Sequence, residues 1–277
     1  MNTTIETFNT TIHKLVSDYG DVAPGEKGYL FTTENPDFFH NLDTRGKDCL
    51  YVGAGGGDPA FYALANGAKN MDIFDNSMLA LTLIAIKKYL ITTLNHKEFI
   101  NLWGGETIFK SLKPLERKNF TPPENAPEII KKFCNTPSIL STSTGYYRLY
   151  DNPYIKNKSV YNKLSTSLHT SNEKLIYSDI EDIDQNVGNK KYDIIYLSTL
   201  LIPYNKLENF YNLLKQDGKI YCDYTYNNNN KYSILSHTYI DHHKNLFNVE
   251  EISFRANKYR DSHKKDIIFC YHKQKTL

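Results

Sequence analysis

The segment YVGAGGGDPAF, residues 51–61, decides how this chain of 277 residues is interpreted. It overlaps the apolar run DCLYVG, residues 48–53, whose length and composition are typical of a buried parallel strand. Glycines at positions 53, 55 and 57 allow a tight turn and let a ligand lie against the main chain. Asp58-Pro59 then predicts a helix start, with Asp58 as N-cap and Pro59 at the first helical position. The segment therefore predicts a strand, a ligand-binding glycine loop and a helix.

An acidic residue at the end of the next predicted strand narrows the kind of ligand. Asp75 ends the segment Asn70–Asp75, where a carboxylate can accept hydrogen bonds from both hydroxyls of a ribose. The pattern indicates a nucleoside-containing cofactor at the carboxyl end of a sheet, with a plain packing turn as the alternative. The glycine loop also satisfies the dinucleotide-binding pattern, so NAD(P) stays open as a cofactor. Against NAD(P), Asp58 places negative charge where a pyrophosphate would approach the helix N-terminus.

The rest of the chain alternates predicted strands and helices. The expected strands are Asp48–Gly53, Asn70–Asp75, Lys174–Ser178, Tyr192–Ser198, Lys219–Tyr226, Asn248–Arg255 and Asp266–His272. The expected helices are Pro59–Asn66, Ser77–Leu94 and Tyr204–Lys215, with shorter pieces at His96–Trp103 and Pro127–Cys134. This alternation predicts an α/β fold with a mostly parallel sheet and right-handed crossovers. The last two strands, separated by a polar loop, predict an antiparallel hairpin at the sheet edge.

The pattern also predicts how the chain is divided. Apolar residues recur at helical spacing near its start: Ile5, Phe8, Ile12, Leu15 and Val16. We therefore expect residues 1–47 to form an N-terminal helical cap and residues 48–277 to form the cofactor-binding domain. The change of pattern at about 95–172 predicts a helical insertion that covers the substrate pocket.

Composition excludes several classes of protein. Hydrophobic residues make up 40% and charged residues 23% of the chain, which excludes wholesale disorder. The net charge of +2 excludes a strongly basic protein built to neutralise a phosphate backbone. The four cysteines form no CxxC and are interpreted as reduced structural thiols in a cytoplasmic protein, with a disulfide or metal role as the alternative. No secretory signal or membrane span is predicted, because the most apolar stretch, Leu79–Leu94, is short and contains Lys87 and Lys88.

With its glycine loop, spaced acid and antiparallel final strand, the sequence resembles the class I S-adenosylmethionine (SAM)-dependent transferases over residues 48–76 and 174–273. The resemblance implies a Rossmann-like, mostly parallel seven-stranded sheet with the last strand inserted antiparallel, and SAM as co-substrate. It also implies cofactor contacts from the loops that follow the first four strands. The residues concerned are Gly53, Ala54, Gly55, Gly57, Asp58, Asp75, Asn76, Ser178, Asp179, Ile180, Ser198 and Thr199.

Within this set the resemblance assigns a role to each part of the cofactor. The glycine loop lines the methionine and ribose portion, and Asp75 holds the ribose. Asn76 lies beside the adenine, Asp179 accepts a hydrogen bond from its amino group, and Ile180 covers the ring. The alternative for Asp179 is a loop acid or a helix cap.

One departure from the family pattern concerns the residue two positions before the first glycine. Methyltransferases usually carry an acid there that helps to fix the methionine end of SAM, whereas this chain has Tyr51. The element ENPDFF, residues 34–39, and the block at 67–105 are similar to betaine-lipid-type aminocarboxypropyltransferases. The spacing of Gly53, Gly55 and Pro59 and the segment LSTLLIPY, residues 197–204, resemble nicotianamine-synthase-like enzymes.

These similarities imply transfer, cyclisation or elimination of the 3-amino-3-carboxypropyl group of SAM, with release of methylthioadenosine. The alternative is methyl transfer to a small molecule, with release of S-adenosylhomocysteine. A further alternative is a non-catalytic nucleotide-binding module or an NAD(P) enzyme. A small-molecule acceptor is expected, and nucleic acid is not, because no Asn/Asp-Pro-Pro-aromatic element follows the fourth strand.

Four residues are candidates for catalysis: Tyr29, Glu34, Arg148 and Tyr204. Arg148 is one of five arginines and lies in the predicted insertion, where a guanidinium suits a carboxylate of SAM or acceptor. Tyr29 and Tyr204, with Tyr146 and Tyr147, could present rings or hydroxyls to the sulfonium. Glu34 could act as a base or bind an amine. Packing or surface roles are the alternatives for all of them.

The sequence predicts no metal site. His237, His242 and His243 lie close to Asp241, but their spacing is not that of a known metal-binding motif. A solvent-facing helix explains the histidines as well, and an acceptor-pocket role is the other alternative.

Overall fold

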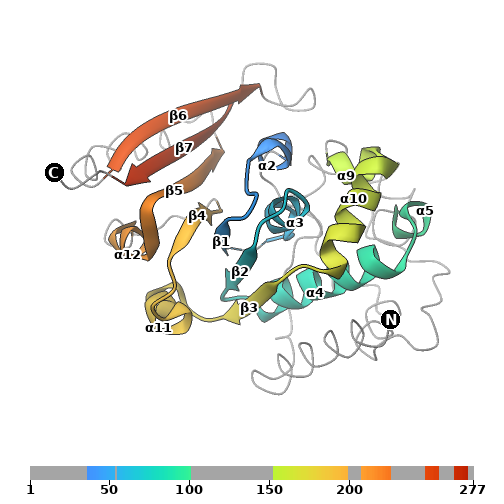
Figure 1. Cartoon of the computed structure of the whole chain (residues 1–277), viewed down its shortest axis with the longest axis horizontal. Helices are drawn as coiled ribbons and strands as arrows, with labels where there is room; N and C mark the ends of the chain where they lie inside the picture. Colours follow the sequence, from blue (N-terminus) through green and yellow to red (C-terminus); the bar gives the residue numbers. More distant parts are fainter. Residues whose placement is uncertain are drawn as a thin grey trace.

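The computed structural model of the chain describes residues 36–53, 55–100, 152–198, 207–225, 247–255 and 265–273. Within these residues, seven strands form one sheet in the order β3-β2-β1-β4-β5-β7-β6 (Figure 1). Neighbouring strands from β3 to β5 are parallel, whereas β7 runs antiparallel to both β5 and β6. The strands are β1 Asp48–Val52, β2 Asn70–Asp75, β3 Glu173–Tyr177, β4 Tyr192–Leu197, β5 Leu214–Thr225, β6 Phe247–Arg255 and β7 Lys265–Lys273.

This strand order confirms the predicted fold. The last strand is inserted antiparallel between β5 and β6, and the β6–β7 pair lies at the edge of the sheet. The order is that of the class I SAM-dependent methyltransferase fold. The classic dinucleotide-binding fold differs, because its sixth strand lies directly beside the fifth.

The central strands β1 and β4 are buried on both faces, which explains why they read as mostly apolar runs. Alternate residues of β1 enter different cores: Cys49 and Tyr51 pack on one face, and Leu50 and Val52 on the other. The first face is covered by α2 Pro36–Asn41, α3 Asp58–Ala65, α4 Met78–Thr93 and α10 Lys158–His169. The second face is covered by α11 Ile183–Val187 and α12 Leu207–Leu213 (Figure 1).

The main difference from the predicted elements lies at the start of β5. The sequence predicted a helix to Lys215 and a strand from Lys219, but α12 ends at Leu213 and β5 begins at Leu214. Leu214 pairs with Tyr192, and an irregularity then shifts the register so that Lys219 pairs with Ile194. A bulge of this kind depends on a partner strand far away in the sequence, so the local pattern does not reveal it.

The start of α3 also differs from the prediction. Gly57, not Asp58, is the N-cap, and Asp58 is the first helical residue with its side chain buried. A Cβ added to Gly57 would lie 2.7 Å from Cγ1 of Ile84 in α4, so the close approach of loop and helix requires glycine. The φ of 75° at Gly57 imposes the same requirement.

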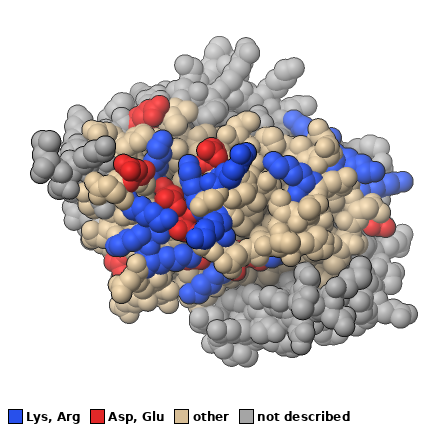
Figure 2. All heavy atoms as spheres, viewed as in Figure 1, with Lys and Arg blue, Asp and Glu red and all other residues tan. Residues whose placement is uncertain are grey.

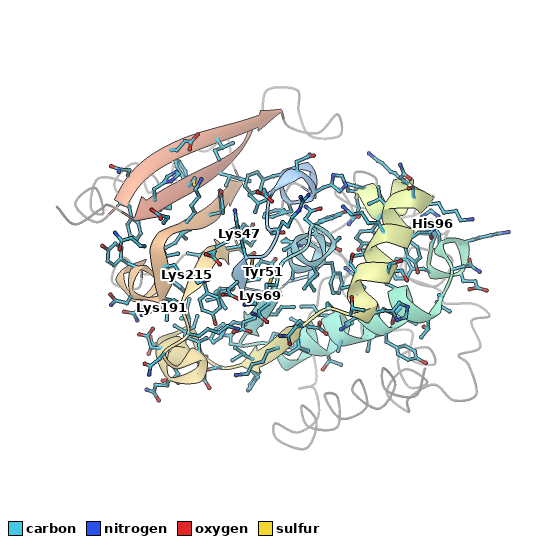
Figure 3. The ribbon with its side chains drawn as sticks, viewed as in Figure 1. Lys47, Tyr51, Lys69, His96, Lys191 and Lys215 are labelled. Carbon is cyan, nitrogen blue, oxygen red and sulfur yellow. The ribbon has the colours of Figure 1, made fainter. Side chains whose placement is uncertain are left out.

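Only part of the predicted insertion is described. Helices α5 His96–Phe99 and α9 Pro153–Lys156 flank the segment 101–151, which lies outside the described residues. A ring nitrogen of His96 lies 3.0 Å from the backbone oxygens of Tyr154 and Ile155, so the two ends of that segment lie side by side (Figure 3). The predicted boundaries at 1–47 and 95–172 stay predictions.

Two further expectations concern cysteines and membranes. Cys49, Cys222 and Cys270 are free and buried, in accord with structural thiols, while Cys134 lies outside the described residues. Within the part of the chain that the structure describes, no helix is long and apolar enough to cross a membrane.

We expect Gly57→Ala to lower the free energy of unfolding by about 2–4 kcal/mol, because it adds both a left-handed alanine and a clash with Ile84. Gly46→Ala is the matched control, since Gly46 has φ 71° and nothing within 4 Å of its added Cβ. The control should cost about 1 kcal/mol. Urea denaturation of both variants measures the difference, and equal losses would show that the contact with Ile84 does not matter.

Candidate cofactor-binding site

The loops after four parallel strands meet at the carboxyl edge of the sheet, as predicted. The Gly53 amide donates to the Phe74 carbonyl of β2 at 3.0 Å, and the Ser198 amide donates to the Val52 carbonyl of β1 at 3.0 Å. On the other side of β2, the Ser178 amide donates to the Asp75 carbonyl at 3.2 Å. These bonds extend the strand ladders by one step and bring the predicted cofactor residues of β1 to β4 to one edge.

The glycine loop itself is built from left-handed backbone. Gly53 has a φ of 78° and Gly55 a φ of 46°, a region that side chains with a Cβ rarely adopt. A Cβ added to Gly55 would have only the Gly53 carbonyl oxygen nearby, at 3.8 Å. The backbone at Gly55 is therefore half-exposed and open to a ligand.

Asp75 is held in place by the start of the next helix. Its Oδ1 accepts a hydrogen bond of 2.7 Å from the Ser77 amide, while Ser77 Oγ caps α4 by accepting from the Ala80 amide. Asp75 is half-buried and the adjacent Asn76 is exposed. A fixed carboxylate at the end of β2 can accept from ligand hydroxyls, which is the role the sequence predicted.

The loop after β3 places an acid at the same edge. Asp179 is exposed and occupies the N-cap position of the 3-10 turn η2 Ile180–Asp182, but its side chain makes no capping hydrogen bond. Ile180 is half-buried beside it. Asp179 is therefore a loop acid at an N-cap position whose side chain does no capping, and its predicted contact with the adenine stays a prediction.

Beneath the glycine loop lies a buried ion pair that the sequence analysis missed. Lys87 of α4 donates to Asp58 Oδ1 at 2.8 Å and to the Gly56 carbonyl at 2.6 Å. Its side chain is 1% exposed and that of Asp58 is 0% exposed. Burial lowers the pKa of Lys87, and the Asp58 carboxylate opposes this shift. The pair fixes the loop to the helix that lies below it.

This pair corrects two expectations about Asp58. The residue lies under the loop with no exposed surface, and its carboxylate contacts Lys87 and Tyr154. Lys87 also neutralises it, and the predicted repulsion of a pyrophosphate therefore loses its basis. The strand order, and not the charge of Asp58, sets this fold apart from the dinucleotide-binding one.

The same carboxylate reaches α9, which lies within the predicted insertion. The Tyr154 hydroxyl of α9 donates to Asp58 Oδ1, and the Tyr62 hydroxyl of α3 donates to Asn152 Oδ1 at 2.5 Å. Burial raises the pKa of Tyr154 well above its usual range, so this hydroxyl stays protonated and remains a donor. This part of the predicted insertion is thus fastened to the helix that follows the glycine loop.

Tyr51, which replaces the usual acid, belongs to the core and not to a polar site. It is 1% exposed, and its ring lies 5.0 Å from that of Tyr196 in β4. Tyr196 in turn contacts Phe39 of α2 at 4.4 Å between ring centroids. An aromatic stack thus joins β1 and β4 to α2 at the position of Tyr51.

Several predicted site residues lie outside the described residues. They are Tyr29, Glu34, Ala54, Tyr146, Tyr147, Arg148, Thr199, Tyr204, His237, Asp241, His242 and His243.

Among the residues that the sequence analysis missed, Lys87 left one signal in the sequence, because a lysine in the middle of an apolar helix needs a buried partner. Tyr154 and Asn152 left none, since their partners are far away in the sequence.

No family model and no curated protein matches this chain. Solved structures include a protein described as a SAM-dependent methyltransferase from Streptococcus mutans, at 10% identity and a TM-score of 0.45, covering 85% of this chain and 47% of that one. This chain therefore spans about half the length of the Streptococcus mutans protein. A rRNA methylase from Streptococcus thermophilus has 12% identity and a TM-score of 0.44, over 87% of this chain and 94% of that one. A precorrin-6y C5,15-methyltransferase from Geobacter metallireducens has 11% identity and a TM-score of 0.41, over 86% and 85%. The fold assignment rests on the strand order of this chain and not on these distant similarities.

We expect Lys87→Met to destabilise the protein by about 3–5 kcal/mol, because it leaves the Asp58 carboxylate buried without a countercharge. The double variant Asp58→Asn/Lys87→Met should recover part of this loss. Lys88→Met is the control, since Lys88 pairs with Glu173 at a half-buried position and should cost at most about 1 kcal/mol. Chemical denaturation measures all three, and similar losses for Lys87→Met and Lys88→Met would contradict the importance of the buried pair.

Proposed function

We propose that this chain is a SAM-dependent transferase that uses SAM as co-substrate. The observation that carries the proposal is the left-handed glycine loop after β1, with Asp75 fixed at the end of β2, in a sheet whose last strand is inserted antiparallel. SAM fits this arrangement because it combines a ribose for the Asp75 carboxylate with an aliphatic tail for the open backbone of the loop.

In this proposal each loop binds one part of SAM. Gly53, Ala54, Gly55 and Gly57 lie along the methionine and ribose, and Asp75 accepts from the ribose hydroxyls. Asn76 and Asp179 bind the adenine edge, and Ile180 packs on its ring. Ser198 and Thr199 face the reacting end of the cofactor. Asp58 shapes the loop from below together with Lys87.

Methyl transfer is the reaction that the fold supports best. Displacement at a sulfonium carbon has a good neutral leaving group, so it needs alignment of nucleophile and carbon more than acid–base chemistry. Tyr29, Glu34, Arg148 and Tyr204 are proposed to surround the acceptor, with Arg148 binding a carboxylate and Glu34 serving as base or amine ligand. The nucleoside product would be S-adenosylhomocysteine.

Transfer of the aminocarboxypropyl group is the second candidate, and Tyr51 is the observation that favours it. A buried ring occupies the position from which an acid usually fixes the methionine end. Another group must then hold the methionine end of SAM. If that end is turned toward the acceptor, its γ-carbon is presented to the attacking atom. The nucleoside product would be methylthioadenosine.

The acceptor is proposed to be a small molecule. Figure 2 shows Lys and Arg side chains over much of the face drawn there, with smaller areas of Asp and Glu among them. Lys47, Lys69, Lys191 and Lys215 lie at the amino ends of the central strands (Figure 3), the opposite edge from the glycine loop. Lys215 pairs with Asp48 and Asp193 at 2.7 Å each. These lysines would hold a nucleic acid away from the proposed transfer site, and their charge is partly neutralised.

Asp75→Ala should weaken SAM binding about 10- to 100-fold, because two hydrogen bonds to a charged acceptor are lost. Isothermal titration calorimetry with SAM measures the change. Asp217→Ala is the control, since Asp217 is an exposed acid at the amino end of β5 and its loss should leave the affinity unchanged. Equal affinity of Asp75→Ala and the native protein would contradict the proposed cofactor site.

The nucleoside product decides between the two reactions. We expect the protein, incubated with SAM and the low-molecular-mass fraction of a cell extract, to release S-adenosylhomocysteine that mass spectrometry detects. Methylthioadenosine in its place would establish aminocarboxypropyl transfer. An RNA fraction incubated in parallel should give no product, and product in that arm alone would overturn the small-molecule acceptor. Absence of both nucleosides in every arm would favour a nucleotide-binding module or an NAD(P) enzyme.

A further inference from the structure

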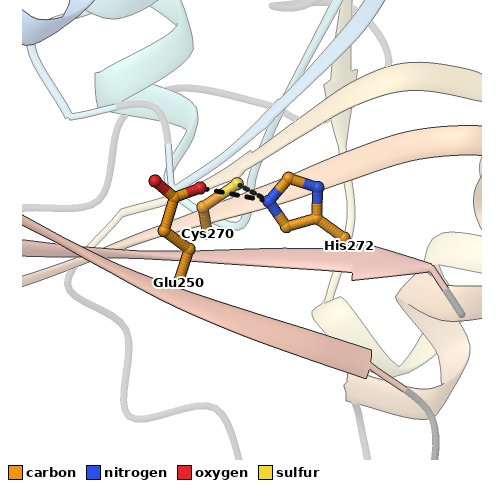
Figure 4. Close-up of side chains that lie close together, drawn as sticks. All are labelled: Glu250, Cys270 and His272. Atoms are coloured by element: carbon orange, nitrogen blue, oxygen red, sulfur yellow. Dashed lines mark hydrogen bonds and ion pairs between the residues drawn. The ribbon is translucent and has the colours of Figure 1, made fainter.

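Three side chains with different donor atoms converge on one face of the β6–β7 hairpin (Figure 4). Cys270 and His272 are two residues apart on β7 and so face the same side of the sheet. Glu250 of β6 stands opposite Cys270 in the antiparallel register. Cys270 Sγ lies 3.3 Å from His272 Nε2, and His272 Nε2 lies 3.4 Å from Glu250 Oε2. We call these three residues the hairpin cluster.

The spacing of these donors matches the ligand shell of zinc. With Zn–S near 2.3 Å and Zn–N or Zn–O near 2.0–2.2 Å, donors at tetrahedral angles lie roughly 3.3–3.6 Å apart. Two of the three separations in the hairpin cluster fall in this range, and all three donor atoms lie within 4.8 Å of one another. The Glu250 side chain is 64% exposed, so a rotamer change can close the remaining separation.

We propose that the hairpin cluster binds one zinc ion through Cys270 Sγ, His272 Nε2 and a Glu250 carboxylate oxygen, with water as the fourth ligand. Thiolate, imidazole and carboxylate are the three protein ligands that zinc accepts. The harder cations magnesium and calcium bind oxygen ligands and do not suit the thiolate.

The burial of the ligands and the groups around them determine from which side the ion enters and how readily the thiol loses its proton. Cys270 is 1% exposed, whereas the His272 side chain is 33% exposed, so the ion enters from the side of His272 and Glu250. Burial raises the pKa of the Cys270 thiol to about 11, Glu250 adds to this rise, and Lys219 of β5 and a hydrogen bond with Tyr221 oppose it. Zinc binds the thiolate, so its binding releases the thiol proton to solvent.

The location separates this ion from the proposed transfer reaction. His272 pairs with Lys219, which pairs with Ile194 near the amino end of β4, whereas the glycine loop lies at the carboxyl edge. β6 is the edge strand of the described sheet and pairs with β7. An ion that joins Glu250 to Cys270 and His272 would fasten this edge strand to the strand beside it. The inference does not depend on SAM binding.

Cobalt(II) and zinc titrations of the purified full chain test the proposal. We expect one equivalent of Co²⁺ to give a thiolate-to-cobalt charge-transfer band and the intense visible bands of tetrahedral cobalt, both abolished by zinc. Cys270→Ala should remove the charge-transfer band and weaken zinc binding at least about 100-fold, since the loss of even an outer partner costs 10- to 100-fold. Cys222→Ala is the matched control, because Cys222 is a buried free thiol that packs on the opposite face of the sheet.

If Cys270→Ala fails to fold, substitution of the exposed ligand Glu250 still tests the proposal. Glu250→Gln should retain the native circular dichroism spectrum and still weaken zinc at least about 10-fold. Zinc should also raise the melting temperature of the native protein more than that of Glu250→Gln. A native protein without the charge-transfer band would overturn the proposal. So would a band that survives Cys270→Ala, or unchanged zinc affinity in a folded Glu250→Gln.

Discussion

A lysine buried beneath the glycine loop is the constraint on which the rest of the structure depends. An ammonium group without water is costly unless it is paired and hydrogen-bonded, and Lys87 obtains both from Asp58 and the Gly56 carbonyl. To meet Lys87, Asp58 must point into the protein, which leaves the start of α3 to Gly57. Asp58 also accepts from Tyr154, so the same pair holds α9, which lies within the predicted insertion. The Lys87–Asp58 ion pair therefore fixes the positions of the glycine loop, α3 and α9 relative to α4.

The local sequence pattern predicted most strands of the sheet, but it did not predict the places where the elements are irregular. β2 begins and ends at the predicted residues Asn70 and Asp75, because polar residues bound a segment that is buried on both faces. The early start of β5 at Leu214 was missed, since its pairing partner Tyr192 is distant in the sequence. The N-cap was misassigned for a similar reason: Asp58 has the right side chain for a cap, but Lys87 of another helix engages it.

The predicted cofactor residues show the same division. Asp75, Ser178 and Ser198 could be placed at one edge because the carboxyl ends of parallel strands share it. Tyr154 and Asn152 could not be found, because tertiary contacts alone bring them to α3. The sequence analysis missed the hairpin cluster for a related reason. Glu250 lies opposite Cys270 only because β6 and β7 pair in one register, and the sequence does not specify that register. A site formed by residues at the ends of neighbouring parallel strands can be predicted from a sequence. A site formed by residues that face each other across two strands cannot, because it depends on the register of the pair.

The antiparallel insertion of β7 has a consequence for the order in which the sheet can form during synthesis. The four strands that carry the candidate cofactor site, β1 to β4, are complete once Leu197 has been made. β5 then waits with one side uncovered, because its neighbour on that side is the last strand of the sheet. β6 is made before β7 and cannot join the sheet without it. A ribosome that pauses between residues 225 and 265 would therefore hold a chain with its ligand-binding edge assembled and its far edge open to wrong strand pairing.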